Sequence, residues 1–462
     1  MKAALRDWQR RCIDSALEHY ETAPHFFCQA TPGAGKTWMA AELANRLLQQ
    51  RKIDLVLCFA PSCQVVEGFR ATFSKVLGRR LDGMIGAVGA ACTYQAMDYQ
   101  DEAFWALLGD YRVLAVFDEI HHCAGQDPLL SNAWGQQIIQ KVQDRAAYTL
   151  ALSGTPWRSD DKGIALARYS SAEGRLICDY RYGLSEAISD NVCRSPRIVL
   201  LDNHAVKLIE ESHSESPVRL FPSFNQLLCK SSISYEELLR HPEIINQLLA
   251  LSITKLDELR AIKPDAGGLV VATDVDHAYQ IALALEAKGE SCRIVTNRDK
   301  RAQDGINEFR ISGSRWLVAV GMVSEGTDIP RLQVCCYLSR IRTELHYRQV
   351  LGRVLRRTGP TDDLAWLYVL AESTLEGFSQ RIADDLPEDL AILTHVHAPA
   401  ELSGDLIEEE ASNCRLSSLR PADSELTKHE LSLTQPSISS DAVPVYQLSF
   451  SQYYHQQLLA LF

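Results

Sequence analysis

Residues 30–37 read Ala-Thr-Pro-Gly-Ala-Gly-Lys-Thr, a pattern that could hold phosphate groups. Glycines leave backbone N–H groups free to turn around an anion, because they have no Cβ to clash with it. A helix that begins here would direct its positive end at the same anion. Lys36 could then reach the outer phosphates of a nucleotide, and Thr37 could hold Mg²⁺. The predicted nucleotide-binding residues are Thr31, Pro32, Gly33, Ala34, Gly35, Lys36 and Thr37.

One position departs from the general phosphate-loop pattern. Ala30 stands where that pattern opens with glycine. The alternative reading is therefore a glycine-rich turn between a strand and a helix that binds nothing. The flanking residues favour the nucleotide site, since an apolar run at 25–29 precedes the loop and apolar residues at helical spacing follow it.

Two adjacent carboxylates, Asp118 and Glu119, follow an apolar run at 111–117 that is typical of a buried strand. The carboxyl ends of parallel strands meet at one edge of a sheet, where ligands bind. At such an edge Asp118 would orient Mg²⁺ and Glu119 would polarise an attacking water. The alternative is that both acids cap the next helix. The phosphate loop upstream favours catalysis.

Residues 349–356 read Gln-Val-Leu-Gly-Arg-Val-Leu-Arg. On a helix the spacing of three puts Arg353 and Arg356 on one face, where they could stabilise charge on a phosphoryl group. The alternative is a solvated basic face. A fourth motif, Ser153-Gly154-Thr155-Pro156, follows an apolar strand at 148–152.

Taken in this order, the motifs resemble those of superfamily 2 helicases and translocases of the DExH type. The resemblance covers roughly residues 1–390 and is nearest to bacterial helicases related to restriction-type (Res) subunits. Runs at 179–183 (Asp-Tyr-Arg-Tyr-Gly) and 342–345 (Arg-Thr-Glu-Leu) strengthen it. It implies ATP hydrolysis with Mg²⁺ between two RecA-like lobes that close around the nucleotide. The implied catalytic residues are Lys36, Glu119, Arg353 and Arg356.

The same resemblance gives roles to residues between these motifs. Arg6 and Gln9 would bind the adenine, while Gly326 and Asp328 would bind the nucleotide from the second lobe. The residues implied to contact nucleic acid are Pro61, Ser62, Thr93, Tyr94, Thr273, Ser324 and Thr327. The residues implied to couple the nucleotide site to lobe movement are His121, Ser153, Thr155 and Gln349.

Alternating strands and helices must position these motifs, and the apolar pattern predicts such α/β lobes with parallel sheets. Further strands are expected at 54–59, 267–273, 291–296, 315–321, 333–339 and 364–370. The predicted divisions are an ATP-binding lobe (1–195), a helical linker or insertion (196–265), a second RecA-like lobe (266–392), an acidic flexible tail (393–445) and a short helix (446–462).

The tail has a composition of its own. Residues 401–441 hold nine acidic and three basic side chains, which is −6 of the net charge of −12. Such a segment, poor in aromatic residues, is typical of a disordered tether. Beyond it Tyr454, Leu458, Leu461 and Phe462 would share one helical face. This helix could dock a protein partner or fold back onto the lobes, and the sequence leaves both open.

Charge and cysteine content limit the class of protein. The acidic balance excludes a large positive surface, so nucleic acid would be bound in local grooves, with modest affinity and steep salt dependence. The 13 cysteines are scattered and odd in number, which excludes a full disulfide framework and favours a cytoplasmic location. No run of 18 apolar residues occurs, so no membrane span is expected.

The sequence therefore predicts an ATP-dependent motor acting on single- or double-stranded DNA, in genome defence or repair. The preference for DNA rests on the resemblance alone. Two alternatives stay open, namely an RNA helicase with the same core and an ATP-gated switch that binds a protein partner without unwinding. Unwinding and simple translocation are not distinguished, because no strand-separating wedge is identifiable.

Overall fold

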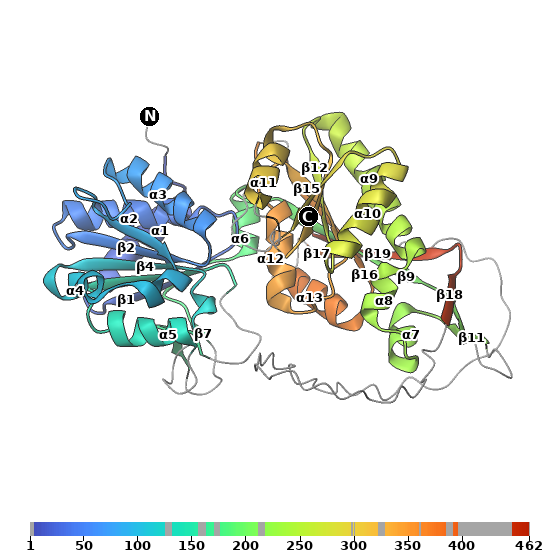
Figure 1. Cartoon of the computed structure of the whole chain (residues 1–462), viewed down its shortest axis with the longest axis horizontal. Helices are drawn as coiled ribbons and strands as arrows, with labels where there is room; N and C mark the ends of the chain where they lie inside the picture. Colours follow the sequence, from blue (N-terminus) through green and yellow to red (C-terminus); the bar gives the residue numbers. More distant parts are fainter. Residues whose placement is uncertain are drawn as a thin grey trace, which may run out of the picture.

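Two α/β lobes lie side by side in the computed structural model, the first in blue to teal and the second in green to red (Figure 1). The structure describes residues 4–124, 132–155, 163–170, 176–210, 218–296, 299, 301–321, 329–359, 362–384, 391–395 and 446–461. Across these ranges, no helix has the length and apolar character needed to cross a membrane.

The first lobe is built on a parallel sheet with the strand order β3-β2-β4-β5-β1-β8. Its strands are β1 (His25–Ala30), β2 (Leu55–Ala60), β3 (Gly89–Thr93), β4 (Val113–Asp118), β5 (Tyr148–Ser153) and β8 (Tyr180–Tyr182). A separate antiparallel pair consists of β6 (Arg168–Tyr169) and β7 (Leu176–Ile177).

Helices cover both faces of this sheet, and β4 shows why. Every residue of β4 is buried. Leu114 and Val116 join the apolar cluster that includes residues of α1 (Asp7–His19), α2 (Lys36–Gln49) and α3 (Cys63–Leu77). Ala115 and Phe117 join a second cluster that includes residues of α4 (Glu102–Asp110). Alternate residues of a strand point to opposite faces, so a continuous apolar run marks a strand buried on both sides.

The helices of the first lobe are α1 (Asp7–His19), α2 (Lys36–Gln49), α3 (Cys63–Leu77), α4 (Glu102–Asp110) and α5 (Ala133–Gln137), with shorter helical turns at Tyr94–Tyr99, Ile120–His122 and Ile138–Val142. The next helix, α6 (Leu184–Ser189), lies at the junction between the lobes (Figure 1). From there the chain enters the second sheet.

The second lobe has the strand order β13-β14-β12-β15-β16-β9-β19-β17. The strands from β13 to β9 are parallel, and the last two are antiparallel to their neighbours. The strands are β9 (Ser195–Asn203), β12 (Gly267–Val271), β13 (Cys292–Thr296), β14 (Trp316–Val320), β15 (Leu332–Tyr337), β16 (Leu364–Leu370), β17 (Ala391–His395) and β19 (Tyr454–Leu461).

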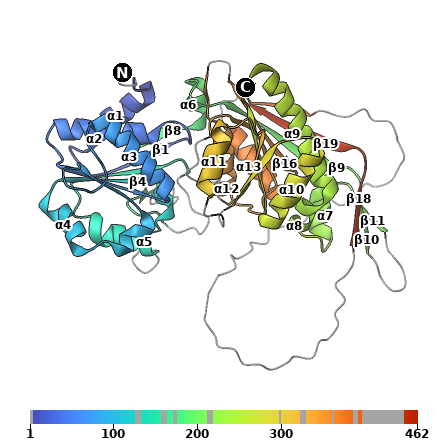
Figure 2. The same cartoon turned by 45° about the horizontal axis from the view of Figure 1, so that its top comes forward.

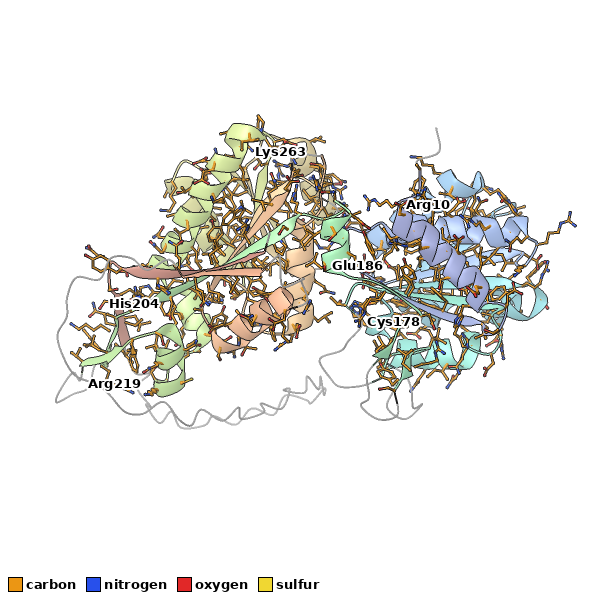
Figure 3. The ribbon with its side chains drawn as sticks, turned by 180° about the vertical axis from the view of Figure 1, so that it is seen from behind. Arg10, Cys178, Glu186, His204, Arg219 and Lys263 are labelled. Atoms are coloured by element: carbon orange, nitrogen blue, oxygen red, sulfur yellow. The ribbon has the colours of Figure 1, made fainter. Side chains whose placement is uncertain are left out.

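The helices of this lobe are α7 (Phe224–Lys230), α8 (Tyr235–Arg240), α9 (Pro242–Ile262), α10 (Val275–Ala287), α11 (Ala302–Ile311), α12 (Glu344–Val354) and α13 (Ser373–Asp384). A small antiparallel sheet of β11 (Val218–Phe221), β10 (Val206–Glu210) and β18 (Tyr446–Phe450) projects from the end of the lobe that faces away from the first lobe (Figure 2). His204 and Arg219 mark this end in Figure 3.

The predicted fold class, two RecA-like lobes with parallel sheets, is confirmed. The segment predicted as a helical linker (196–265) contains α7, α8 and α9 but also β9, which lies inside the second sheet. The boundaries of the five predicted segments stay a proposal.

The short helix predicted at 446–462 is wrong, because its described residues form β18 and β19. β19 pairs with β9 along its length, with Leu458 opposite Val199. A spacing of four residues places Tyr454 and Leu458 on one face of a strand as well as of a helix, and the free edge of β9 decides in favour of the strand. The segment thus folds back onto the second lobe. Of the predicted acidic tail (393–445), only 393–395 are described, as part of β17.

Candidate active site

The phosphate-loop pattern forms a turn between β1 and α2. Gly33 and Gly35 have φ angles of 85° and 92°, a left-handed conformation that a side chain disfavours. Ala30, which replaces the expected first glycine, is the buried last residue of β1 and is not among the residues with positive φ. The loop therefore needs glycine at its two later positions only, and the departure at Ala30 leaves its geometry intact.

Two residues of the predicted adenine-binding segment hold this loop, Arg6 directly before α1 and Gln9 in its first turn. Arg6 Nη1 donates to the carbonyl oxygen of Ala34 at 2.7 Å. Gln9 Nε2 donates to the carbonyl oxygen of Gly35 at 3.0 Å, and Gln9 Oε1 accepts from the backbone N–H of Arg6 at 2.9 Å. Both side chains thus lie at the start of α2, where the phosphate loop ends.

The two acidic residues lie at the end of β4, beside the same loop. Glu119 has a left-handed backbone (φ 50°, ψ 50°), which is uncommon for a residue with a Cβ and concentrates at functional sites. Its Oε1 is 3.4 Å from Nζ of Lys36, and its Oε2 accepts from the N–H of Gly154 at 3.2 Å. Lys36 Nζ also donates to the carbonyl oxygen of Ala30 at 3.1 Å. The carboxylate of Glu119 therefore faces the loop.

The neighbouring carboxyls have opposite tendencies to ionise. Burial, followed by the charge of Glu119, raises the pKa of Asp118 to about 7. Burial also opposes ionisation of Glu119, but Lys36 and then His121 outweigh it and lower the pKa of Glu119 to about 2. Asp118 Oδ1 is buried and has no hydrogen-bond partner among the described residues. Because such an oxygen is costly to leave unpaired, Asp118 fits a ligand of a divalent cation.

Three of the predicted coupling residues form a cluster around Glu119. Ser153 Oγ lies 3.4 Å from Oε2 of Glu119 and 2.9 Å from Nδ1 of the buried His121. The same hydroxyl accepts from the N–H of Thr155 at 3.2 Å. A movement of the Ser153–Thr155 segment would therefore change the contacts of the Glu119 carboxylate, because the Ser153 hydroxyl touches it.

A cavity of about 370 Å³ between the lobes contains the predicted catalytic groups. The second lobe contributes Gln349, Arg353 and Arg356 to it. Gln349 and Arg353 lie on α12, but α12 ends at Val354, so the prediction that Arg353 and Arg356 share one helical face is wrong. Arg356 lines the cavity from the extended backbone that follows the helix and bridges to Cys193. The first lobe contributes, among others, Gly33, Gly35, Lys36, Thr37, Asp118 and Glu119. The structure thus brings together side chains that lie more than 200 positions apart in the sequence.

Helix α12 crosses the phosphate loop at one close contact. A Cβ on Gly352 would lie 2.8 Å from Cβ of Pro32, so only glycine fits here. Gln349, Arg353 and Arg356 line the cavity on one side of this contact. On the other side a second cavity of about 360 Å³ is lined by Arg348 and Leu351 of α12 and also by Arg181 and Glu344. Residues of the two sequence runs at 179–183 and 342–345 therefore line the same cavity between the lobes.

The residues predicted to contact nucleic acid are spread over both lobes. Pro61 lines the nucleotide cavity. Ser62 and Thr93 begin helices, with their hydroxyl oxygens accepting backbone N–H groups at 3.4 Å and 3.2 Å. Thr273 Oγ1 accepts from Arg240 at 3.2 Å and lies 3.0 Å from His277 Nδ1. The remaining predicted positions Ser324, Gly326, Thr327 and Asp328, together with Pro156, lie outside the described residues.

Tyr94 corrects one of these predictions. Its side chain is fully buried, stacks on Trp134 with ring centroids 5.7 Å apart, and donates to the carbonyl oxygen of Asp118 at 2.7 Å. A nucleic acid cannot reach it in this arrangement. The side chain instead supports the backbone that carries the two acids.

Sequence reasoning missed two features of this site, one that lines the nucleotide cavity and one that contacts the phosphate loop. One face of α3 lines the cavity with Gln64, Val65, Gly68 and Thr72. The sequence feature that could have marked this face is Gly68, a glycine inside a helical pattern. The other is Cys193, whose Sγ lies 3.6 Å from the carbonyl oxygen of Pro32. No motif marks that cysteine.

The fold and this site define a class of protein: a two-lobed P-loop nucleotide-binding protein whose site lies between the lobes. Residues 2–158 match the family described as "Type III restriction enzyme, res subunit". The fold is similar to that of a fragment of a putative HsdR subunit of a type I restriction enzyme from Vibrio vulnificus YJ016. That likeness has a TM-score of 0.58 and 15% sequence identity, and it covers 83% of this chain and 67% of that one.

The chain is also similar to longer proteins. It is 32% identical over 378 residues to an uncharacterized protein of Mycobacterium tuberculosis, a match that covers 77% of this chain and 60% of that protein. It is 23% identical over 376 residues to the DNA 3'-5' translocase XPB2 of Sulfurisphaera tokodaii, covering 77% of this chain and 79% of that protein. The chain spans about three fifths of the length of the mycobacterial relatives it matches.

The ordered motifs, the family match over residues 2–158 and the similarity to the DNA translocase support a superfamily 2 protein of the helicase and translocase type that is related to the restriction Res subunits.

Proposed function

We propose that the protein is an ATP-dependent motor that moves on or unwinds DNA, as a helicase or translocase. The observation that carries this proposal is the single cavity that joins Lys36 and Glu119 of the first lobe to Arg353 and Arg356 of the second. Neither lobe alone supplies both sets of groups. Hydrolysis would therefore require the two lobes to be together, which is the requirement of a motor.

Each group has a role that follows from its position. Backbone N–H groups of the loop and Lys36 would hold the phosphates of ATP, while Arg6 and Gln9 lie where α2 begins and would contact the adenine. Glu119, ionised at neutral pH, would accept a hydrogen bond from the attacking water and orient it. Arg353 and Arg356 would stabilise the charge that develops on the transferred phosphoryl group.

Mg²⁺ fits the residues at this site. Asp118, with its buried unpaired oxygen, and Thr37, which lines the same cavity, would hold it. The ion would supply neutralisation of the phosphate charge. Asp118 must lose its proton to bind the ion, and a raised pKa makes that binding depend on pH near neutrality.

Movement would be coupled to hydrolysis through the hydroxyl of Ser153. This group contacts both Glu119 and His121, and the two residues after it, Gly154 and Thr155, line both cavities between the lobes. A shift of the cleft on loss of the γ-phosphate would therefore alter the contacts of Glu119. Gln349 on α12 would sense the same event from the second lobe.

DNA is proposed as the track because of the relatives. The XPB2 relative is described as a DNA translocase, and the matching family and structure come from restriction enzymes. A place in genome defence or repair is consistent with this. Binding would rest on local contacts in both lobes, since the net charge is −12.

The test is steady-state ATP hydrolysis by the pure protein with single-stranded DNA, duplex DNA, single-stranded RNA or duplex RNA at low salt. Glu119→Gln serves as the control for contaminating hydrolysis. We expect stimulation by DNA and none in the control. Stimulation by RNA alone would replace the proposed track with RNA. Slow hydrolysis indifferent to all four nucleic acids would favour an ATP-gated switch.

A further inference from the structure

Arg194 lies where the chain passes from the first lobe into the second, immediately before β9. Its side chain is fully buried, as is that of its partner Asp362. Nε and Nη2 of Arg194 donate to the two carboxylate oxygens of Asp362, each at 2.6 Å. This is a two-pronged pairing that the planar guanidinium provides and lysine cannot.

The remaining donors of Arg194 reach backbone carbonyl groups. Nη1 donates to the oxygens of Leu332 and Val354, each at 2.6 Å, and Nη2 donates to that of Pro330 at 2.8 Å. Val354 is the last residue of α12. A helix end carries unpaired carbonyl groups and partial negative charge, so a buried cation there fixes its position.

The backbone at this point ties α12 to the phosphate loop. The N–H of Arg194 donates to the carbonyl oxygen of Leu355 at 2.7 Å, and Cys193 forms an isolated antiparallel bridge with Arg356. Cys193 Sγ in turn lies 3.6 Å from the carbonyl oxygen of Pro32. One short segment therefore contacts both the loop and residues 355 and 356, which directly follow the helix that carries Arg353.

Asp362 holds the chain on the far side of the arginine pair. Its Oδ2 accepts from the backbone N–H of Thr358 at 3.0 Å and from the Thr358 hydroxyl at 2.7 Å. Lys263, labelled in Figure 3, donates to the same oxygen at 3.0 Å. Burial opposes ionisation of Asp362, but the Arg194 fork keeps its pKa well below the usual range. Residues 354–358 are thus held at both ends by one ion pair.

We infer that Arg194 is a positioning residue that sets the place of Arg353 and Arg356 relative to the phosphate loop. A buried ion pair is weak evidence for stability, because apolar residues of the same volume serve that end equally well. Here two hydrogen bonds of the pair hold backbone groups on either side of Arg356, the carbonyl group of Val354 and the N–H of Thr358. The inference rests on the proposed hydrolysis of ATP and assigns Arg194 no contact with the nucleotide.

The test compares Arg194→Lys with a matched control, Lys263→Met. Lysine keeps the charge beside Asp362 but loses the fork that reaches the carbonyl groups. Lys263→Met removes a cation from the same carboxylate and one hydrogen bond to the Thr358 hydroxyl, but it leaves the contact of Arg194 with the end of α12 in place. Both variants are measured alone and with Arg353→Ala. The readouts are the DNA-stimulated kcat, the Kd for ATP, the melting temperature and hydrogen exchange of peptides covering 344–359.

Arg194→Lys is expected to lower kcat about 10- to 100-fold, with Kd for ATP unchanged, since a displacement of about 1 Å suffices for such a loss. In the Arg353→Ala background it should add no more than about twofold, because the two residues act as one unit. Lys263→Met should leave kcat unchanged. Losses that multiply with Arg353→Ala, or an equal loss in Lys263→Met, would overturn the inference.

Failure of the proposed function gives a different result. If Arg353→Ala hydrolyses ATP like the wild type, the proposed catalytic role of Arg353 fails. Hydrogen exchange then tests separately whether Arg194 holds the backbone around residues 354–358 in place. Faster exchange at 350–357 in Arg194→Lys alone would support positioning by Arg194. Equal exchange at 350–357 in Arg194→Lys and Lys263→Met would overturn it.

Discussion

Replacing Gly352 with alanine should move the lobes apart at the nucleotide site and leave each lobe folded. The new Cβ would lie 2.8 Å from Cβ of Pro32 and 3.0 Å from its Cγ. Non-bonded carbon atoms prefer about 3.5–4.0 Å, so the helix must withdraw by roughly 1 Å. Arg353 is the next residue and would withdraw with it. Since a misplacement of about 1 Å can lower a rate about 100-fold, we expect kcat to fall about 10- to 100-fold.

The assay compares Gly352→Ala with Gly377→Ala, a glycine-to-alanine change inside α13. A Cβ on Gly377 would meet only Nη1 of Arg381, at 3.7 Å, which is an ordinary contact. Alanine stabilises a helix interior by about 0.5–1 kcal/mol relative to glycine. The melting temperature of neither variant should therefore fall below that of the wild type. Only Gly352→Ala should lose turnover. Wild-type kcat in Gly352→Ala, or a melting temperature well below that of the wild type, would refute the reasoning.

Four further predictions concern the same cavity. Lys36→Ala should abolish tight ATP binding, measured by calorimetry, because the cation that faces the phosphates is lost. Glu119→Gln should keep ATP bound while turnover stops, and a normal rate would show that Glu119 does not orient the water. Arg353→Ala should lower kcat with little change in Kd for ATP, since its contact strengthens as charge develops. The pKa of Asp118 is raised to about 7, so protons compete with Mg²⁺ below that pH. Titration of Mg²⁺ should therefore show affinity rising from pH 6 to pH 8 in the wild type and a flat profile in Asp118→Asn.

The chemistry of the site could be located from sequence because each motif couples residue type to a strand end or a helix face. The phosphate loop follows β1, Asp118 ends β4 with Glu119 directly after it, and Arg353 lies in the last turn of α12 with Arg356 just beyond the helix. Parallel α/β topology then brings strand ends to one edge. Local patterns of this kind do not depend on distant packing.

Predictions failed or were absent where distant packing decides. Tyr94 lies in a motif that suggests a surface contact, yet Trp134 covers it. The segment at 446–461 has spacing that fits a helix, but the free edge of β9 pairs with it as a strand. Arg194 carries no motif at all, and its five hydrogen bonds involve residues more than 130 positions away. None of these contacts produces a periodic pattern or a motif that could be recognised in the sequence.

The pairing of β19 with β9 has a consequence for the order in which the protein can be assembled. β9 is synthesised before every other strand of the second sheet, whereas β19 is synthesised after all of them. An apolar strand with one unpaired edge is a template for association with other chains. During synthesis the edge of β9 that pairs with β19 therefore stays unpaired until β19 has been made. The first lobe precedes β9 in the chain, so its parallel sheet can form before that. We therefore expect the nucleotide-binding lobe to fold early in synthesis. The second lobe should stay prone to aggregation through the edge of β9 until β19 pairs with it.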